Sequence, residues 1–309
     1  MPIPKKIHFY WGNETMSWMR YMTLKSFRMF NPDWEIILYI SPCAPKTKTW
    51  SSPNFQDYFY FKGSDYMPHA KELNINILPW DLADNGVIPL DNNFEIGASH
   101  KSNFFKWSKL ATEGGVYSDL DILYFRPIDD FYNKLEGYTT AICQTKYLSI
   151  GLLASAGQDD FFKDIFISGI ERYNAGEYQS AGVVTIYDLY NKIPEMDDIT
   201  KMVFDNYPRL KSYDLSIRCP QDRVLQIAQE KYPQSKFYNI PMDLVYPFDS
   251  TQVGLVFDSD LHISDLSPET IGYHWYAGHL IAQNFNNLFT EQNYTRINSL
   301  FTNIVKEII

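Results

Sequence analysis

Two acidic side chains, separated by one residue, lie inside an apolar stretch and are the strongest candidates for chemistry. Asp119 and Asp121 follow residues 116–118 and precede residues 122–125, which are mostly apolar or aromatic. Strand alternation predicts both carboxylates on one side, where their charges repel unless a cation or strong donors compensate. Carboxylate oxygens with open positions beside them suit Mg²⁺ or Mn²⁺ carrying a diphosphate. The alternative, a strand end facing water, is disfavoured because apolar residues continue beyond Asp121.

The elements that must position this pair follow from hydrophobic periodicity and from turn residues. Predicted strands cover residues 7–11, 35–39, 75–78, 116–125, 138–143 and 148–154. Predicted helices cover residues 17–30, 98–113, 159–173, 179–189, 197–207 and 221–231. The helix before the acidic pair ends at Gly114-Gly115, where glycine can adopt the left-handed conformation that closes helices. Alternating strands and helices favour a mostly parallel sheet in an α/β domain, with its ligand crevice beyond the carboxyl ends of the strands.

Composition excludes several classes of function. The chain has 309 residues and a formal net charge of −10, which disfavours a nucleic-acid partner because phosphate backbones attract basic surfaces. No apolar run approaches the roughly 20 residues that a membrane-spanning helix needs, and the N-terminal residues lack an apolar signal region. Three widely spaced cysteines (Cys43, Cys143, Cys219) predict neither a disulfide framework nor a zinc cluster.

These features predict a cytoplasmic protein, with peripheral membrane attachment as the alternative. The tail from Asn293 carries one apolar helical stripe, at Ile297, Leu300, Phe301, Ile304, Val305 and Ile308. We expect this stripe to pack against the domain rather than to lie on a membrane, because that is the usual fate of an amphipathic helix.

Three segments resemble glycosyltransferases of family 32, which carry an Asp-x-Asp sugar-nucleotide motif and are related to capsule-type hexosyltransferases, initiating mannosyltransferases and glucosylating toxins. Residues 3–12 resemble the first strand of that family, residues 102–121 its central motif and residues 273–275 its closing His/Trp motif. The resemblance implies a GT-A nucleotide-diphospho-sugar transferase fold, with a mostly parallel central sheet flanked by helices. It implies a single domain over residues 1–309, with donor binding in about 1–130 and acceptor binding in about 131–309.

The resemblance also implies roles for individual residues. Trp11 would stack on the donor base, with Tyr10 as a second nucleotide-binding candidate. Asp119 would contact the ribose or the donor sugar, and Asp121 would bind Mn²⁺ or Mg²⁺. An indole at the carboxyl end of a strand offers a flat face to a base, and such stacking contributes about 1 to 3 kcal/mol. Ordinary core packing of Trp11 is the competing interpretation.

Late residues of the chain supply further candidates. His274 would complete the metal site as its third ligand, and His279 is the rival for this position. Gln221 and Asp222 loosely resemble a segment that reaches the anomeric carbon in related retaining transferases, which makes Gln221 a donor-sugar candidate and Asp222 a catalytic one. Asp222 could equally cap the helix that follows it.

The sequence departs from the family pattern on the helix before the double glycine. The family usually has Asp and Arg there to hold donor-sugar hydroxyls, whereas this chain has Asn103 and Lys106. Asn103 keeps an acceptor oxygen without the charge, and Lys106 keeps the charge without the bidentate fork of arginine. Both residues stay donor-sugar candidates, with the choice of donor left open.

The sequence therefore predicts a metal-dependent hexosyltransferase of polysaccharide or glycan synthesis. Its donor would be a nucleoside diphosphate sugar, UDP-linked in preference to GDP-linked, and its acceptor a glycan or a lipid-linked sugar. One alternative is a metal-dependent phosphoester hydrolase, which would need further acidic ligands near the pair; Asp129 and Asp130 are the nearest in sequence. The other is a non-catalytic sugar-nucleotide-binding protein on the same scaffold.

Overall fold

A computed structural model describes residues 1–42, 61–90, 96–144, 148–177, 179–190, 221–258 and 261–309 of the chain. Its central element is a seven-stranded sheet of order β3-β2-β1-β4-β7-β6-β8. The strands are β1 Lys6–Trp11, β2 Glu35–Ile40, β3 Asn76–Pro79, β4 Gly115–Ser118, β6 Thr140–Gln144, β7 Leu148–Ser155 and β8 Phe237–Asn239. All neighbours are parallel except β7, which is antiparallel to β4 and β6.

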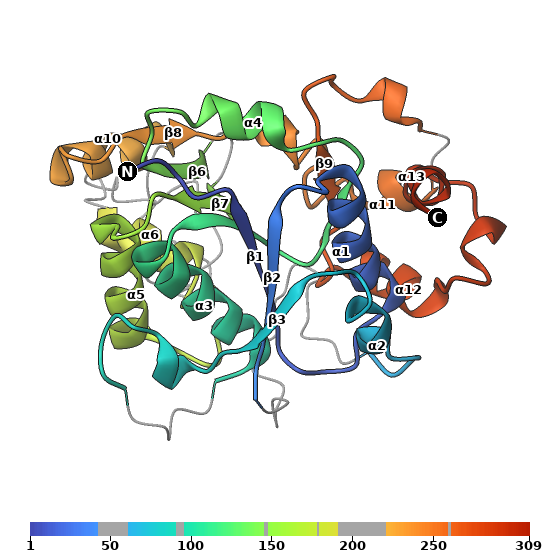
Figure 1. Cartoon of the computed structure of the whole chain (residues 1–309), viewed down its shortest axis with the longest axis horizontal. Helices are drawn as coiled ribbons and strands as arrows, with labels where there is room; N and C mark the ends of the chain where they lie inside the picture. The colour runs from blue at the N-terminus through green and yellow to red at the C-terminus, as the bar shows by residue number, and fades with distance from the viewer. Residues whose placement is uncertain (43–60, 91–95, 145–147, 178, 191–220, 259–260) are drawn as a thin grey trace, which may run out of the picture.

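Helices cover both faces of this sheet (Figure 1). One layer holds α3 Ala98–Thr112, α5 Asp160–Arg172, α6 Val183–Tyr190 and α10 Gln221–Lys231. The other side holds α1 Trp18–Phe30, α2 Met67–Ala70, α11 Val253–Asp258, α12 Leu280–Leu288 and α13 Leu300–Ile308. Strand alternation divides the core, because Phe9 of β1 packs with the α1 side and Tyr10 with the α3 side. The predicted α/β class, with a mostly parallel central sheet flanked by helices, is confirmed.

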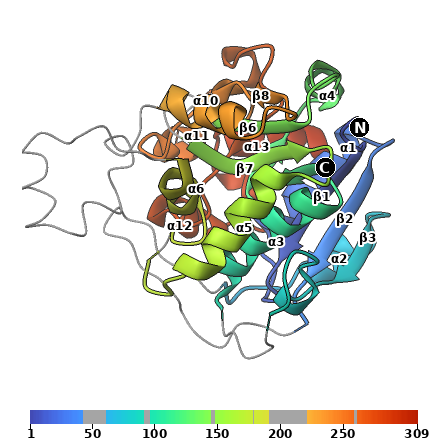
Figure 2. The same ribbon diagram turned by 90° about the vertical axis from the view of Figure 1, so that its left-hand side faces the viewer.

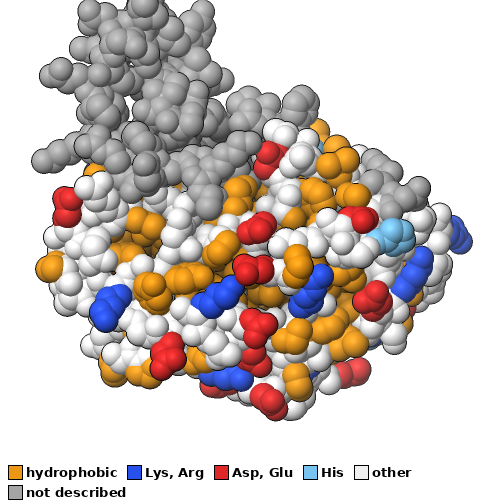
Figure 3. Space-filling model, turned by 90° about the horizontal axis from the view of Figure 1, so that it is seen from above, with side chains coloured by type: hydrophobic (Ala, Val, Ile, Leu, Met, Phe, Trp, Pro, Cys, Tyr) orange, Lys and Arg blue, Asp and Glu red, His pale blue; other side chains and the backbone are white. Residues whose placement is uncertain are grey.

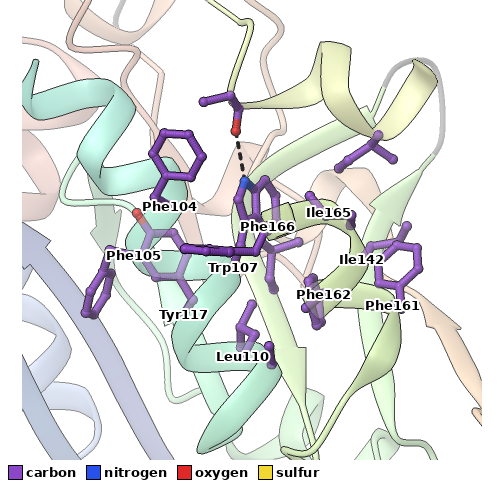
Figure 4. Close-up of a cluster of buried hydrophobic side chains, with 14 of the residues drawn as sticks. Phe104, Phe105, Trp107, Leu110, Tyr117, Ile142, Phe161, Phe162, Ile165 and Phe166 are labelled. Atoms are coloured by element: carbon purple, nitrogen blue, oxygen red, sulfur yellow. Dashed lines mark hydrogen bonds between the residues drawn. The ribbon is translucent and has the colours of Figure 1, made fainter. Parts of the chain in front are cut away.

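Helix α3, which precedes the acidic pair, packs closely against α5. Figure 2 shows it lying beside α5, and Figure 4 shows the aromatic side chains that join the two helices. Phe104 lies 5.7 Å from Phe166 and Trp107 lies 6.0 Å from Phe162, as measured between ring centroids. The indole N–H of Trp107 donates to the Ala181 carbonyl at 2.8 Å. Because buried aromatic side chains contribute much of the energy of a core, α3 is a rigid base for the residues it carries toward β4.

The predicted end of α3 is confirmed. Gly114 and Gly115 both have positive φ, at 66° and 107°. A side chain at Gly114 would collide with the backbone of Gly157, so this position requires glycine for two independent reasons. The tight turn lets β4 begin directly after the helix.

The prediction of one strand over residues 116–125 is wrong. β4 ends at Ser118, and β5 Ile122–Tyr124 belongs to a separate two-stranded sheet with β9 Gly272–His274. The break arises because the chain changes partners: the Asp119 N–H donates to the Gly151 carbonyl on β7, whereas the Asp121 carbonyl accepts from the Trp275 N–H after β9. The acidic pair therefore lies in the crossing between two sheets.

Other boundaries differ less. The helix predicted from residue 179 begins at Val183, and the helix predicted over 197–207 lies outside the described residues. The sequence patterns missed α4 Asp129–Lys134, α11, α12 and the three-residue strands β8 and β9. Apart from α12, which is as long as the predicted tail helix α13, these elements are too short to complete enough periods for a hydrophobic pattern to identify them.

The amphipathic tail packs as expected. In α13 the apolar residues Phe301, Ile304 and Val305 are fully buried in a cluster shared with α1, α11 and α12. Within the part of the chain that the structure describes, no helix combines the length and the apolar character needed to cross a membrane. Cys143 is a buried free thiol, and the other two cysteines lie outside the described residues.

Candidate active site

Three potential metal ligands converge where two sheets meet. Asp119 and Asp121 follow β4, and His274 ends β9, which pairs with β5 so that Ile122 lies opposite His274. His274 Nε2 lies 3.0 Å from Asp121 Oδ1 and 3.9 Å from Asp119 Oδ2. One ligand atom from each residue lies within 4.8 Å of the other two. Parallel β1 and β4 also direct Trp11 to this edge, because the carboxyl ends of parallel neighbours open on the same side.

The two carboxylate oxygens of Asp119 have different surroundings: one accepts hydrogen bonds, and the other faces His274. Asp119 Oδ1 accepts from the Tyr117 hydroxyl at 2.6 Å and from Lys106 Nζ at 3.2 Å. Lys106 is 2% exposed and also donates to the Ile150 carbonyl at 3.1 Å. Burial lowers the pKa of Lys106, and the attraction of Asp119 opposes that shift. Asp119 Oδ2 is left facing His274.

Asp121 is divided in the same way. Its Oδ2 accepts from the Ala277 N–H at 2.9 Å, and its Oδ1 faces His274. Burial alone would raise the pKa of Asp121, but His274, Arg20 and the Ala277 N–H together hold that pKa well below its usual value. The carboxylate is therefore ionised over the working range of most proteins.

This donor set fits a divalent cation. Two carboxylate oxygens point at one imidazole nitrogen, while protein donors hold the other two oxygens in place. Oxygen-rich sets suit Mg²⁺ and Mn²⁺, and hydrogen-bond donors that orient the ligand side chains are typical of metal sites. His274 Nδ1 accepts from the Tyr276 N–H at 3.2 Å, which puts the proton of a neutral ring on Nε2. Coordination through Nε2 would require that proton to move to Nδ1, and the Tyr276 N–H would then give up its bond to Nδ1.

His279, the rival third ligand, has a different place. It precedes α12 as the N-cap residue, and its Nδ1 accepts from the Ile281 N–H at 3.2 Å. The structure brings His274 to the two aspartates, and His279 satisfies the open end of a helix.

Of the two aromatic residues at the end of β1, only Trp11 offers an accessible ring. Trp11 is half-buried, its N–H donates to the Glu14 carbonyl at 2.8 Å, and the Arg20 guanidinium lies over one face at 5.1 Å from the ring centroid. Tyr10 is 5% exposed and stacks on Phe105 at 5.1 Å. Trp11, which also packs partly against the core, is therefore the residue of the two that a base could contact.

Of the donor-sugar candidates, the structure describes the side chains of two, Asn103 and Lys106, which lie on α3. Asn103 is 8% exposed on α3, one turn from Lys106, and lies close to Gly182. Lys106 uses its charge on Asp119, as described above. The side chains of Gln221 and Asp222, at the start of α10, lie outside the described part, so their roles stay predictions.

Sequence reasoning missed Arg20, Gly151 and Tyr246. The Tyr246 hydroxyl accepts from the Gly151 N–H at 3.0 Å, and burial raises the pKa of Tyr246 well above its usual value. Gly151 lies on β7 directly behind the cluster: an added Cβ would be 2.5 Å from the Tyr246 hydroxyl and 2.9 Å from Asp119 Oδ2. A glycine inside a predicted strand was the available signal, since it marks a close approach.

We expect Gly151→Ala to disturb the cluster. The new methyl group would push Asp119 and Tyr246 apart, at a stability cost of about 1 to 3 kcal/mol, and would weaken Mn²⁺ binding. Gly254→Ala is the matched control, because its Cβ would meet only Ile281 at 3.8 Å. Thermal unfolding and Mn²⁺ titration of both variants check this. If Gly151→Ala and Gly254→Ala behave alike, the close approach is unimportant.

Comparison with known proteins gives structural similarity only. No family model and no curated protein matches the chain. Among solved structures, the PaToxG glycosyltransferase has 15% identity, covers 75% of this chain and 77% of its own, and has a TM-score of 0.38. Mouse xyloside xylosyltransferase 1 has 10% identity over 88% of this chain and 98% of its own, with a TM-score of 0.40. The galactosyltransferase LgtC has 12% identity over 94% of this chain and 100% of its own, with a TM-score of 0.37. Similarity this distant assigns neither substrate nor residue role, so the site geometry must do so.

Proposed function

We propose that this chain is a metal-dependent glycosyltransferase of the GT-A type. It would transfer a hexose from a nucleoside diphosphate sugar, UDP-linked in preference to GDP-linked, to a glycan or lipid-linked acceptor with retention of configuration. The observation that carries the proposal is the cluster of Asp119, Asp121 and His274 at the carboxyl edge of parallel strands, beside the accessible indole of Trp11.

Charge balance supports a diphosphate ligand. Two carboxylates, Asp119 and Asp121, are offset by the cations Lys106 and Arg20, with Arg20 acting on Asp121 and Lys106 paired with Asp119. A divalent cation would therefore leave an excess of positive charge in a partly buried site. A diphosphate supplies the negative charge that such a site favours.

The chain's own residues would divide the work of transfer. Trp11 would stack on the base, Lys106 would fix Asp119, and Asp121 and His274 would hold the cation together with Asp119. When bound, the cation supplies neutralisation of the charge on the departing diphosphate. In the reaction the bond between the sugar C1 and the diphosphate oxygen breaks, an acceptor oxygen bonds to C1, and the acceptor proton passes to the phosphate or to solvent. Selection of the hexose by Asn103 and Lys106 belongs to this proposal.

The hydrolase alternative is less well supported. It calls for additional acidic ligands, yet the potential ligand group within the described residues consists of two aspartates and one histidine. Asp129 lies at the start of α4, where it accepts from the Trp34 N–H at 2.9 Å and pairs with Lys5 at 3.0 Å. It therefore serves a different part of the fold.

A nucleic-acid partner stays disfavoured. The net charge is −10, and on the face in Figure 3 the Lys and Arg side chains are interspersed with acidic ones. That face, where the structure describes it, lacks the basic stripe that follows a phosphate backbone.

A panel of UDP- and GDP-sugars tested by thermal shift, with and without Mn²⁺, tests the proposal. A ligand at 100 times its Kd stabilises the folded state by about 2.7 kcal/mol, so one donor with Mn²⁺ should raise the Tm clearly. Release of free sugar from that donor would separate an active enzyme from a binding protein. If no nucleotide sugar shifts the Tm and a phosphoester is hydrolysed instead, the proposal is wrong.

We expect Trp11→Ala to weaken donor binding more than turnover. Loss of stacking worth about 1 to 3 kcal/mol raises the donor KM roughly 5- to 150-fold, with a smaller change in kcat, if the stack is equal in ground and transition states. Trp11→Phe, which keeps an aromatic face, should recover much of the loss. An unchanged KM with a lowered Tm would instead support a core role for Trp11.

A further inference from the structure

Arg20 has an unusual environment for a surface-accessible cation. Its guanidinium lies over the Trp11 ring at 5.1 Å and over the Trp275 ring at 5.5 Å, as measured to the ring centroids. Trp11 ends β1, and Trp275 directly follows His274. Among the described residues the guanidinium makes no hydrogen bond or ion pair, although Arg20 is only half-buried.

Helix α1, which carries Arg20, is hydrogen-bonded to the segment that contains the acidic pair. The Thr23 hydroxyl donates to the Leu120 carbonyl at 3.2 Å, and the Ser26 hydroxyl accepts from the Tyr124 N–H at 3.2 Å. Residues three apart on a helix share a face, so Arg20 lies one turn before Thr23 on the side facing the Asp119–Asp121 crossing. From this side its charge contributes to the lowered pKa of Asp121.

A guanidinium that lies over two aromatic rings is well prepared to bind an anion. Contact with two rings restricts its motion, and its N–H donors, which make no hydrogen bond to the described residues, stay available for a planar fork contact. Arginine forks match phosphate oxygens bidentately. The guanidinium contacts the indole proposed for the base and also Trp275, the residue next to His274 of the cluster proposed for the cation, and a diphosphate would join that base to that cation.

We propose that Arg20 is a specificity-determining residue that binds the diphosphate of the donor and distinguishes it from a nucleoside monophosphate. This inference rests on the proposed function. The competing role is purely electrostatic: Arg20 would only offset the charges of Asp119 and Asp121 and touch no ligand.

Binding measurements on Arg20→Gln separate the two roles. The first probe is Mn²⁺ alone. The others, measured separately at saturating Mn²⁺, are UDP compared with UMP and GDP compared with GMP. Charge-assisted hydrogen bonds contribute about 1.5 to 3 kcal/mol, so the better nucleoside diphosphate should bind about 10- to 100-fold more weakly. The matching monophosphate should change less than about 3-fold, and Mn²⁺ alone should bind as well or better because a nearby positive charge is gone.

Two further variants complete the test. Arg20→Lys keeps the charge without the fork and should lose less than Arg20→Gln. Lys25→Gln removes the same charge from another face of α1 and should leave all affinities unchanged. Equal weakening of diphosphate and monophosphate, no weakening of either, or weaker binding of Mn²⁺ alone would overturn the inference. If the unmodified chain itself binds neither UDP nor GDP with Mn²⁺, the proposed function fails, and the role of Arg20 fails with it.

Discussion

Replacement of Asp121 by asparagine is expected to reduce hexose transfer by a factor of about 10³ or more while the chain stays folded. Asp121 is 8% exposed, and its Oδ1 is the oxygen closest to His274. The amide removes the charge that would hold the cation, and loss of one charged stabilising group in an active site costs several kcal/mol of transition-state energy, of order 10²- to 10³-fold or more. The fold should persist because the amide oxygen can still accept from the Ala277 N–H and repulsion with Asp119 falls.

This expectation is checked by transfer rates at saturating donor over a Mn²⁺ titration, alongside urea unfolding. Asp129→Asn is the matched control, because Asp129 pairs with Lys5 away from the cluster. Activity of Asp121→Asn equal to that of the unmodified chain at limiting Mn²⁺ would remove Asp121 from the metal site.

The second large effect is expected at Lys106, which the sequence marks as a departure from the family pattern. Lys106→Met would leave Asp119 without its cation while keeping a side chain of similar length. Breaking a buried ion pair costs about 3 to 5 kcal/mol, and we expect the lower end because Asp119 is 25% exposed and keeps its bond from Tyr117. The variant should also bind nucleotide sugar poorly, since Asp119 Oδ2 would lose its fixed direction.

Mn²⁺ provides the discriminating measurement for Lys106. Without the ammonium group the repulsion between the two aspartates is larger, so Mn²⁺ should stabilise Lys106→Met against unfolding more than it stabilises the unmodified chain. Lys106→Arg, which keeps the charge, should show the ordinary response. Equal Mn²⁺ stabilisation of the Met variant and the unmodified chain would mean that Lys106 does not act on the cluster.

Local patterns predicted the elements that complete several periods or carry strong end signals. Helix α3 with its Gly114-Gly115 stop, and the strands β1 and β2, follow from residues close in sequence. The pairing of β5 with β9 does not, because it joins segments about 150 residues apart through three-residue strands. His274 could be proposed from a resemblance, but only that non-local pairing brings it to the aspartates.

Asp119 and Asp121 do lie on one side, as expected, but the strand that was expected to place them there is absent. Strand alternation was expected to place Asp119 and Asp121 on one side, yet neither residue lies in a strand. Their side chains converge because the crossing between two sheets is held by the Gly151 carbonyl and the Trp275 N–H. Arg20 could not be singled out, since its significance lies in contacts with residues far along the chain, whereas Gly151 left a signal as a glycine inside a predicted strand.

The central claim is that Asp119, Asp121 and His274 hold a divalent cation that carries a nucleoside diphosphate. Calorimetric titration with Mn²⁺, in the absence and presence of UDP or GDP, tests it most directly. We expect one Mn²⁺ per chain, with a Kd that falls when the nucleotide is present and a reciprocal gain in nucleotide affinity, and we expect both effects to vanish in a folded Asp121→Asn chain. Mn²⁺ binding that is independent of the nucleotide, or that is unchanged in Asp121→Asn, would contradict the account.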